Sequence, residues 1–121
     1  IRDWSVTGVQ TCALPISKLS PQEAVALIHE AGGIAVLAHP SELVDKTLPE
    51  RLLAAEPFDG IEVWHPSADA QAQAHWLALA KQRGLLVSGG SDFHGIPDRF
   101  PTKLGIWQVQ YDDVKGVIEW K

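Results

Sequence analysis

Three histidines and one aspartate stand where apolar segments of the chain end. His39, His65 and the pair Asp92 and His94 each follow a short apolar run. In parallel α/β sheets the carboxyl ends of the strands meet at one edge, and ligands bind there. A carboxylate together with neutral imidazoles suits Zn, Mn or Fe better than an ion that prefers oxygen alone. The spacing therefore predicts a divalent metal site, with His39, Asp92 and His94 as ligands.

Each of these residues also fits a simpler role. Asp92 could cap an ordinary turn and leave His94 solvated, and His39 alone could be a hydrogen-bonded structural residue. For His65 three roles stay open: binding a substrate phosphate, donating a proton at the metal site as a catalytic acid, or packing beside Trp64. The metal interpretation gains weight because separate strand ends offer such groups at one edge.

Polar residues around these positions are candidates for substrate binding. Ser91 and Arg99 flank the Asp92–His94 pair, and a guanidinium group there could clamp a phosphate. Arg99 also fits a plain surface charge. Glu62 lies in the second apolar run, where pairing with a basic group is favoured over a place inside the barrel.

Alternating helices and strands must position these groups. Ser20 to Glu23 predicts a helix start with a capping box, and paired glycines end that helix. Helices are further expected at 48–55, 69–83 and 112–120, and strands at 34–38, 60–64, 85–88 and 104–109. This order predicts an α/β fold with parallel strands. Because three or four strands cannot close a barrel, the expectation is an incomplete barrel.

The first seventeen residues differ from the rest. Residues 1–3 and 6–16 agree with one reading frame of a sequencing adapter, with index codons at Trp4 and Ser5. We therefore expect 1–17 to be non-native and 18–121 to form one domain that continued upstream of Lys18. Cys12, the single cysteine, lies in the adapter-like segment. A cysteine-free remainder fits a reducing, cytoplasmic compartment.

Charge and hydropathy exclude two classes of partner. The chain has 10 basic and 15 acidic residues and a net charge of -5, which argues against an extended nucleic-acid surface. A phosphorylated small molecule or nucleotide remains compatible, because bound metal ions reverse the charge locally. No apolar run approaches the roughly 18 residues that a membrane span needs.

Three blocks of the sequence resemble the later part of the polymerase-and-histidinol-phosphatase (PHP) phosphoesterases. The blocks run from Ser20 to Pro40, from Gly60 to Pro66 and from Gly84 to Gly95. Within the PHP family, the resemblance is to phosphatases and exonucleases that act on nucleoside bisphosphates or short RNA ends. Ala68 departs from the pattern, since many relatives have a second histidine there.

The resemblance implies the C-terminal portion of a PHP domain at 18–121, a seven-stranded β/α barrel fold and up to three divalent ions (Mn, Zn, Fe or Mg). By position, His39 would ligate one ion, and Asp92 and His94 others. The family's early His-x-His and further ligands have no counterpart in the sequence. The resemblance therefore implies a phosphoric ester hydrolase whose 121 residues here have little activity alone.

Two other functions remain open at this stage. An amidohydrolase-type metal enzyme would also end with a strand-end aspartate, but it commonly carries a bridging lysine, and no lysine here follows a strand. A non-catalytic PHP-like module would be expected to lose ligands, yet His39, Asp92 and His94 are all present.

Overall fold

The computed structural model describes residues 18–121. The adapter-like segment 1–17, with Cys12, lies outside the described residues. The described elements are, in chain order, helix α1 (Pro21–Glu30), strand β2 (Val36–Leu37), the short 3-10 helix η1 (Pro40–Glu42), helix α2 (Leu48–Ala55), strand β3 (Gly60–Trp64), helix α3 (Ala70–Arg83), strand β4 (Leu86–Gly89) and helix α4 (Tyr111–Ile118).

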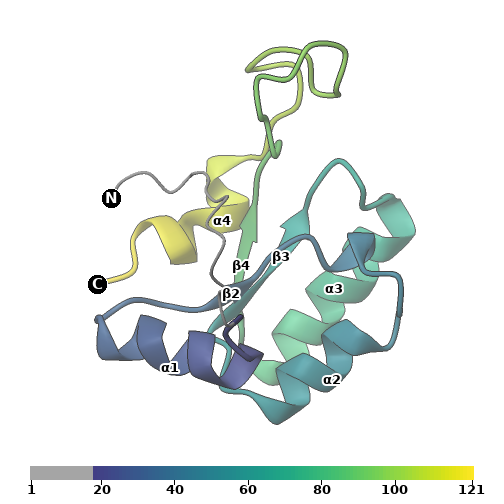
Figure 1. Cartoon of the computed structure of the whole chain (residues 1–121). Coiled ribbons are helices and arrows are strands. Elements are labelled where there is room, and N and C mark those ends of the chain that lie inside the picture. Colours follow the sequence, from purple (N-terminus) through teal and green to yellow (C-terminus); the bar gives the residue numbers. More distant parts are fainter. Residues whose placement is uncertain (1–17) are drawn as a thin grey trace, which may run out of the picture.

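The three strands form one parallel sheet in the order β2-β3-β4. Leu37 pairs with Ile61, and Ile61 pairs with Val87. Helices α2 and α3 lie on one side of the sheet, and α4 packs against β4 on the other (Figure 1). The α/β fold with parallel strands predicted from the sequence is thus confirmed, with three strands.

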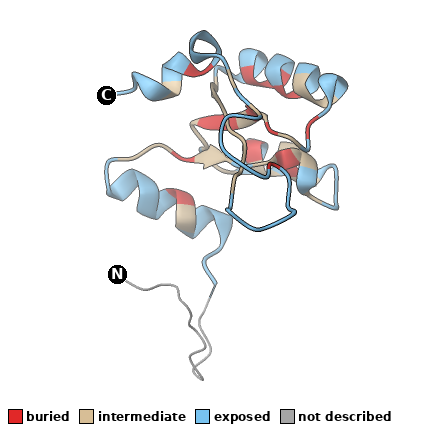
Figure 2. Cartoon of the chain, turned by 90° about the horizontal axis from the view of Figure 1, so that it is seen from above, coloured by how far each residue is buried: buried red, intermediate tan, exposed pale blue. Residues whose placement is uncertain are grey.

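The core lies between the sheet and helices α2 and α3. Ile61 and Val63 of the central strand are completely buried and pack with Trp76 and Leu79 of α3. Buried residues cluster on the strands and the helix sides turned towards them, whereas the segment before α4 is exposed (Figure 2). At roughly 1.5–3 kcal/mol per buried large apolar side chain, this layer is the main source of stability.

The start of α1 and both ends of α3 form as the sequence predicts, whereas α4 ends at Ile118, before the expected residue 120. The Ser20 hydroxyl accepts a hydrogen bond from the Glu23 backbone N–H at 3.1 Å, and the Glu23 carboxylate accepts one from the Ser20 N–H at 3.3 Å, which completes the capping box. Asp69 caps α3 by accepting from the Ala72 N–H. Gly84 ends α3 with φ of 66°, a left-handed conformation that glycine adopts at little cost.

The prediction of a strand at 104–109 is wrong. No strand forms there among residues 18–121, and the segment runs as turns and irregular backbone. Leu104 and Ile106 are 73% and 42% exposed, so no neighbouring strand covers them. Val109 instead places its side chain close to Gly89 of β4. The apolar residues of this segment therefore do not form a strand, although β4 lies at the edge of the sheet beside Val109.

The connections after the strands carry the candidate site residues. Because all three strands run in the same direction, the segments after β2, β3 and β4 leave at the same edge (Figure 1). The segment after β4 extends furthest from the sheet before α4 returns the chain to it. Within 18–121, no helix has the length and apolar character needed to cross a membrane.

Candidate metal centre

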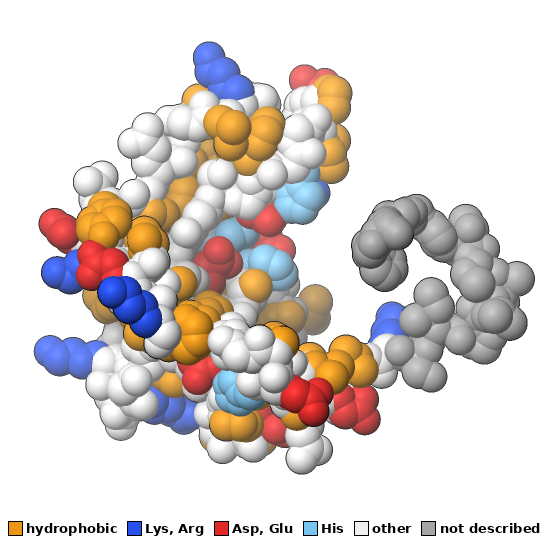
Figure 3. All heavy atoms as spheres, turned by 90° about the vertical axis from the view of Figure 1, so that its left-hand side faces the viewer, with side chains coloured by type: hydrophobic (Ala, Val, Ile, Leu, Met, Phe, Trp, Pro, Cys, Tyr) orange, Lys and Arg blue, Asp and Glu red, His pale blue; other side chains and the backbone are white. Residues whose placement is uncertain are grey.

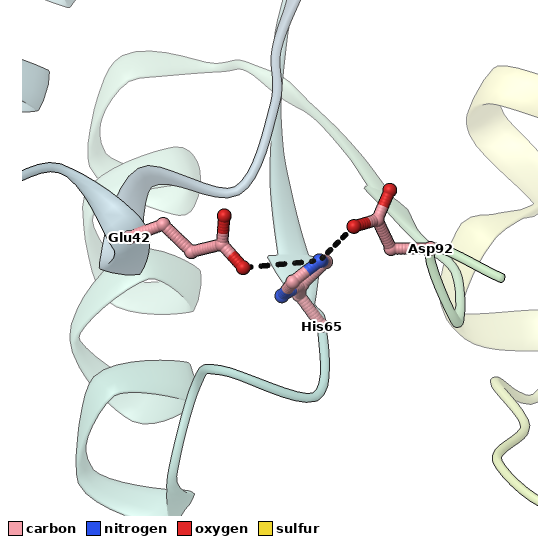
Figure 4. A group of neighbouring side chains, drawn as sticks. All are labelled: Glu42, His65 and Asp92. Atoms are coloured by element: carbon pink, nitrogen blue, oxygen red, sulfur yellow. Dashed lines mark ion pairs between the residues drawn. The ribbon is translucent and has the colours of Figure 1, made fainter. Parts of the chain in front are cut away.

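His65, Glu42 and Asp92 meet at the carboxyl edge of the sheet. Nε2 of His65 lies 3.7 Å from an Asp92 carboxylate oxygen and 4.0 Å from a Glu42 carboxylate oxygen. One donor atom from each of the three side chains falls within 4.8 Å of the others. Figure 4 shows the imidazole between the two carboxylates, which come from η1 and from the segment after β4.

His39 adjoins this group. Its Nδ1 lies 3.7 Å from the second oxygen of Glu42, and its ring centre is 5.5 Å from that of His65. Histidine and acidic side chains gather in the middle of one face of the molecule (Figure 3). The structure thus brings His39, His65 and Asp92 together, as the strand-end positions predict, and adds Glu42.

Two imidazole nitrogens at this point are buried without a partner. Among residues 18–121, neither Nδ1 of His39 nor Nε2 of His65 has a hydrogen-bond partner, and His65 is only 3% exposed. A buried polar atom left unpaired costs about 1–3 kcal/mol. Imidazole nitrogen and carboxylate oxygen are ligands for Zn, Mn or Fe. These donors therefore fit a divalent cation.

The backbone is constrained at two of the candidate ligands. His39 has φ of 28° and Asp92 has φ of 54°, a left-handed region that non-glycine residues seldom adopt. Such conformations persist where the surrounding structure fixes them, and they concentrate at functional sites. For His39 the fixing contact is a 2.7 Å hydrogen bond from its backbone N–H to the Glu62 carboxylate. Among residues 18–121, Glu62 therefore pairs with backbone and with no basic side chain.

The His65 ring is oriented by Ser67. The Ser67 backbone N–H donates to Nδ1 of His65 at 3.0 Å, and the Ser67 hydroxyl lies 2.7 Å from the same nitrogen. An Nδ1 that accepts from an N–H carries no proton, so the neutral ring carries its proton on Nε2. Binding a metal through Nε2 would require the opposite tautomer, with Nδ1 donating to the hydroxyl.

The other expected site residues lie at the rim. His94 is exposed, and its Nδ1 is hydrogen-bonded at 2.6 Å to the Asp92 carbonyl, 3.7 Å from the Asp92 carboxylate. Arg99 donates to that carboxylate at 3.3 Å while remaining 47% exposed. Ser91 is half-buried directly before Asp92. Arg99 thus contacts the site rather than serving as an isolated surface charge.

Glu42 is the residue that the sequence did not reveal. It is one of 15 acidic residues, and it lies in a turn rather than at a strand end. The one local indication of its role is its position three residues after His39, because a short 3-10 turn places residues i and i+3 on the same side of the turn. The contact of Glu62 with His39 likewise has no local signal, because it depends on the pairing of β2 with β3.

Comparison with known proteins finds relatives that match part of this chain. No family model matches the chain. The phosphoribosyl 1,2-cyclic phosphate 1,2-diphosphodiesterase of Eggerthella lenta is 37% identical over 90 residues, which cover 74% of this chain and 34% of that protein. The 3',5'-nucleoside bisphosphate phosphatase of Chromobacterium violaceum is 40% identical over 79 residues, 62% of this chain and 28% of that protein.

A solved structure agrees with these relatives. The crystal structure of a protein described as a metal-dependent phosphoesterase, from Bifidobacterium adolescentis, superposes with a TM-score of 0.63 at 32% identity. It matches 87% of this chain and 38% of its own. This chain is a homologue of the PHP phosphoesterases. It spans about a third of the length of the PHP relatives that it matches, and the resemblance seen in the three sequence blocks is confirmed.

Proposed function

We propose that this chain contributes to a site that hydrolyses phosphate esters with divalent metal ions. The observation that carries the proposal is the convergence of the Glu42 and Asp92 carboxylates on one buried point beside His65, next to an Nδ1 of His39 that has no hydrogen-bond partner among the described residues. The names of the relatives point to the same chemistry, since both act on phosphate esters of a pentose-containing molecule.

Glu42 and Asp92 would hold an ion, with His39 beside Glu42 and His94 beside Asp92. Such an ion supplies Lewis-acid chemistry: it makes water nucleophilic near neutral pH and offsets negative charge on the phosphoryl group. Manganese, zinc and iron suit this mixed nitrogen and oxygen set, and magnesium suits it less well.

His65 serves as the proton donor in this proposal. Ser67 holds its Nδ1 as an acceptor, so the proton on Nε2 points towards the space between the two carboxylates. A proton at that position can be passed to the leaving oxygen of an ester. Arg99, at the exposed rim, binds phosphoryl oxygens through its guanidinium group, and the Ser91 hydroxyl contributes a further hydrogen bond.

The substrate class is a phosphorylated small molecule, nucleotide or short oligonucleotide. The net charge of -5 favours a compact substrate held by a metal over a long nucleic acid held by a basic surface. A panel of phosphomonoesters, nucleoside bisphosphates and short oligonucleotides would identify the preferred ester in a protein that contains this chain.

Manganese binding tests the proposal directly. Electron paramagnetic resonance of free Mn²⁺ during titration gives the dissociation constant for the native chain and for Asp92→Asn. Loss of the carboxylate is expected to weaken binding at least about tenfold, or about 1.4 kcal/mol. Asp98→Asn is the matched control, because Asp98 lies on the same segment with φ of 65° and asparagine tolerates that conformation equally well. Equal binding by native chain and Asp92→Asn, or no binding at all, would refute the proposal.

A further inference from the structure

A cavity lies next to the candidate metal centre. Its volume is about 370 Å³, within the range of small-molecule sites, and it is open to solvent and lined by the segments after β2 and β3 and by the start of α3. Its polar and aromatic lining consists of Ser41, Lys46, Ser67, Asp69, His75 and Trp76. None of these residues belongs to the proposed metal ligands, so the cavity is a separate feature of the same edge.

The cavity and the metal centre share a wall. Ser41 directly precedes Glu42, and Ser67 contacts Nδ1 of His65 through both its backbone N–H and its hydroxyl. A molecule whose phosphate lies at Asp92 and His65 therefore has this cavity beside it for the group that the phosphate is attached to.

The charges in the lining are balanced. Lys46 brings one ammonium group, which donates to the Ser41 carbonyl at 2.8 Å. Asp69 brings one carboxylate, of which one oxygen accepts from the Ala72 N–H at 2.8 Å. A second phosphate would meet one cation but also the Asp69 anion, and opposing charges of this kind cancel. The lining therefore suits a neutral group with hydroxyls better than a second anion.

The remaining surface suits the carbon skeleton of such a group. The rings of His75 and Trp76 form an edge-to-face pair with centres 4.6 Å apart. The Trp76 indole N–H is already satisfied by the Ser41 hydroxyl at 3.0 Å, so the indole offers the cavity mainly its apolar surface. Serine hydroxyls and a carboxylate beside an aromatic surface are the groups that bind a sugar ring and its hydroxyls.

We propose that this cavity binds the ribose of the phosphorylated substrate, with the Asp69 carboxylate accepting hydrogen bonds from the ribose hydroxyls. Carboxylates recognise ribose hydroxyls in this way in dinucleotide-binding proteins. Lys46 and the two serines complete the hydrogen bonds to the ring. This inference rests on the proposed function, because it takes the phosphate to lie at the metal centre.

Nuclear magnetic resonance of the full ¹⁵N-labelled chain with Mg²⁺ tests the inference, with ribose 5-phosphate and inorganic phosphate as probes. Ribose 5-phosphate is expected to shift the Trp76 indole N–H and the backbone N–H groups of 69–72, whereas inorganic phosphate leaves them in place. Asp69→Asn keeps the helix cap and replaces a charged acceptor by a neutral one, which is expected to weaken ribose 5-phosphate binding roughly fivefold. Asp112→Asn, in the first turn of α4, is the matched control.

The outcomes separate this inference from the proposed function. If ribose 5-phosphate shifts only residues near Asp92, or if Asp69→Asn binds it as tightly as the native chain, the ribose site is refuted while the metal site stands. If the Mn²⁺ titration shows no metal binding, the proposed function fails. Shifts in the cavity that depend on Asp69 would then still support a ribose site, and an unchanged spectrum would refute it.

Discussion

The carboxylate of Glu62, in the central strand, accepts a 2.7 Å hydrogen bond from the backbone N–H of His39. The pairing of Leu37 with Ile61 brings these two residues to the same level of the sheet. His39 is held there in a left-handed conformation with φ of 28°, which turns its ring to within 5.5 Å of the His65 ring. The Glu62 side chain thus fixes the backbone of His39, where the chain leaves β2.

Replacing Glu62 tests this arrangement. In Glu62→Ala the part-buried N–H of His39 loses a charged acceptor, and we expect the free energy of unfolding to fall by roughly 1.5–3 kcal/mol. Glu62→Gln keeps a neutral acceptor and should cost less. Urea denaturation measures both values, with Glu30→Ala on the exposed end of α1 as the control. Equal stability of Glu62→Ala and native chain would contradict the assigned contact.

The tautomer of His65 distinguishes a proton donor from a metal ligand. Because the Ser67 backbone N–H donates to Nδ1, we expect the neutral ring to carry its proton on Nε2, both without metal and with Zn²⁺ bound. The ¹⁵N chemical shifts of the imidazole report the tautomer directly. A change to the Nδ1–H form on adding Zn²⁺ would show instead that His65 ligates the ion through Nε2.

Asp59 makes stability depend on pH in the acid range. Burial alone would raise the pKa of its carboxyl, but hydrogen bonds from the Ala35 N–H and from His29 outweigh burial and lower the pKa below the ordinary value of 3.8. A lowered folded-state pKa gives stability that is present above 3.8 and is lost as the pH falls through the folded-state value.

Urea midpoints measured between about pH 2 and 5 would show this loss. Asp59→Asn keeps an acceptor for the Ala35 N–H but cannot titrate, so its stability should change less over this interval. Asp112→Asn, on an exposed part of α4, serves as the comparison. The same pH dependence in Asp59→Asn and native chain would contradict the assignment.

Gly84 ends α3 for reasons of backbone conformation alone. A Cβ atom at Gly84 would meet nothing within 4 Å, but φ is 66°. Gly84→Ala should therefore lower the free energy of unfolding by about 1–2 kcal/mol. Gly90 also has open space around it and is not among the positive-φ glycines, so Gly90→Ala should have almost no effect. Similar losses of unfolding free energy in both variants would show that the cost does not come from the positive φ of Gly84.

The 121-residue chain is expected to bind Mn²⁺ but to hydrolyse phosphate esters slowly. Glu42 and Asp92, with His39 beside Glu42, are the proposed ligands among the described residues, whereas the PHP resemblance implies a centre of up to three ions. Release of phosphate from a nucleoside bisphosphate, measured with and without Mn²⁺, checks this expectation. Rapid Mn²⁺-dependent release that Asp92→Ala abolishes would show that these residues suffice.

Local sequence patterns determined most of the fold. The capping box at Ser20, the glycine at 84 and the apolar runs gave the helices and strands, because each pattern acts over a few neighbouring residues. They also placed His39, His65 and Asp92 at strand ends, and parallel pairing then brought these ends to one edge. The same reasoning failed at 104–109, where the apolar residues lie in turns and irregular backbone beside the edge strand β4.

The tertiary structure alone decided which side chains complete the site. Glu42 has the same local character as other exposed glutamates, and it reaches His65 only because η1 folds back over the end of β3. Glu62 supports His39, and Ser67 sets the His65 tautomer, through contacts fixed by strand register and by one turn. Such contacts depend on how segments that are distant in the sequence are placed in space, and residue types along the chain do not encode that placement locally.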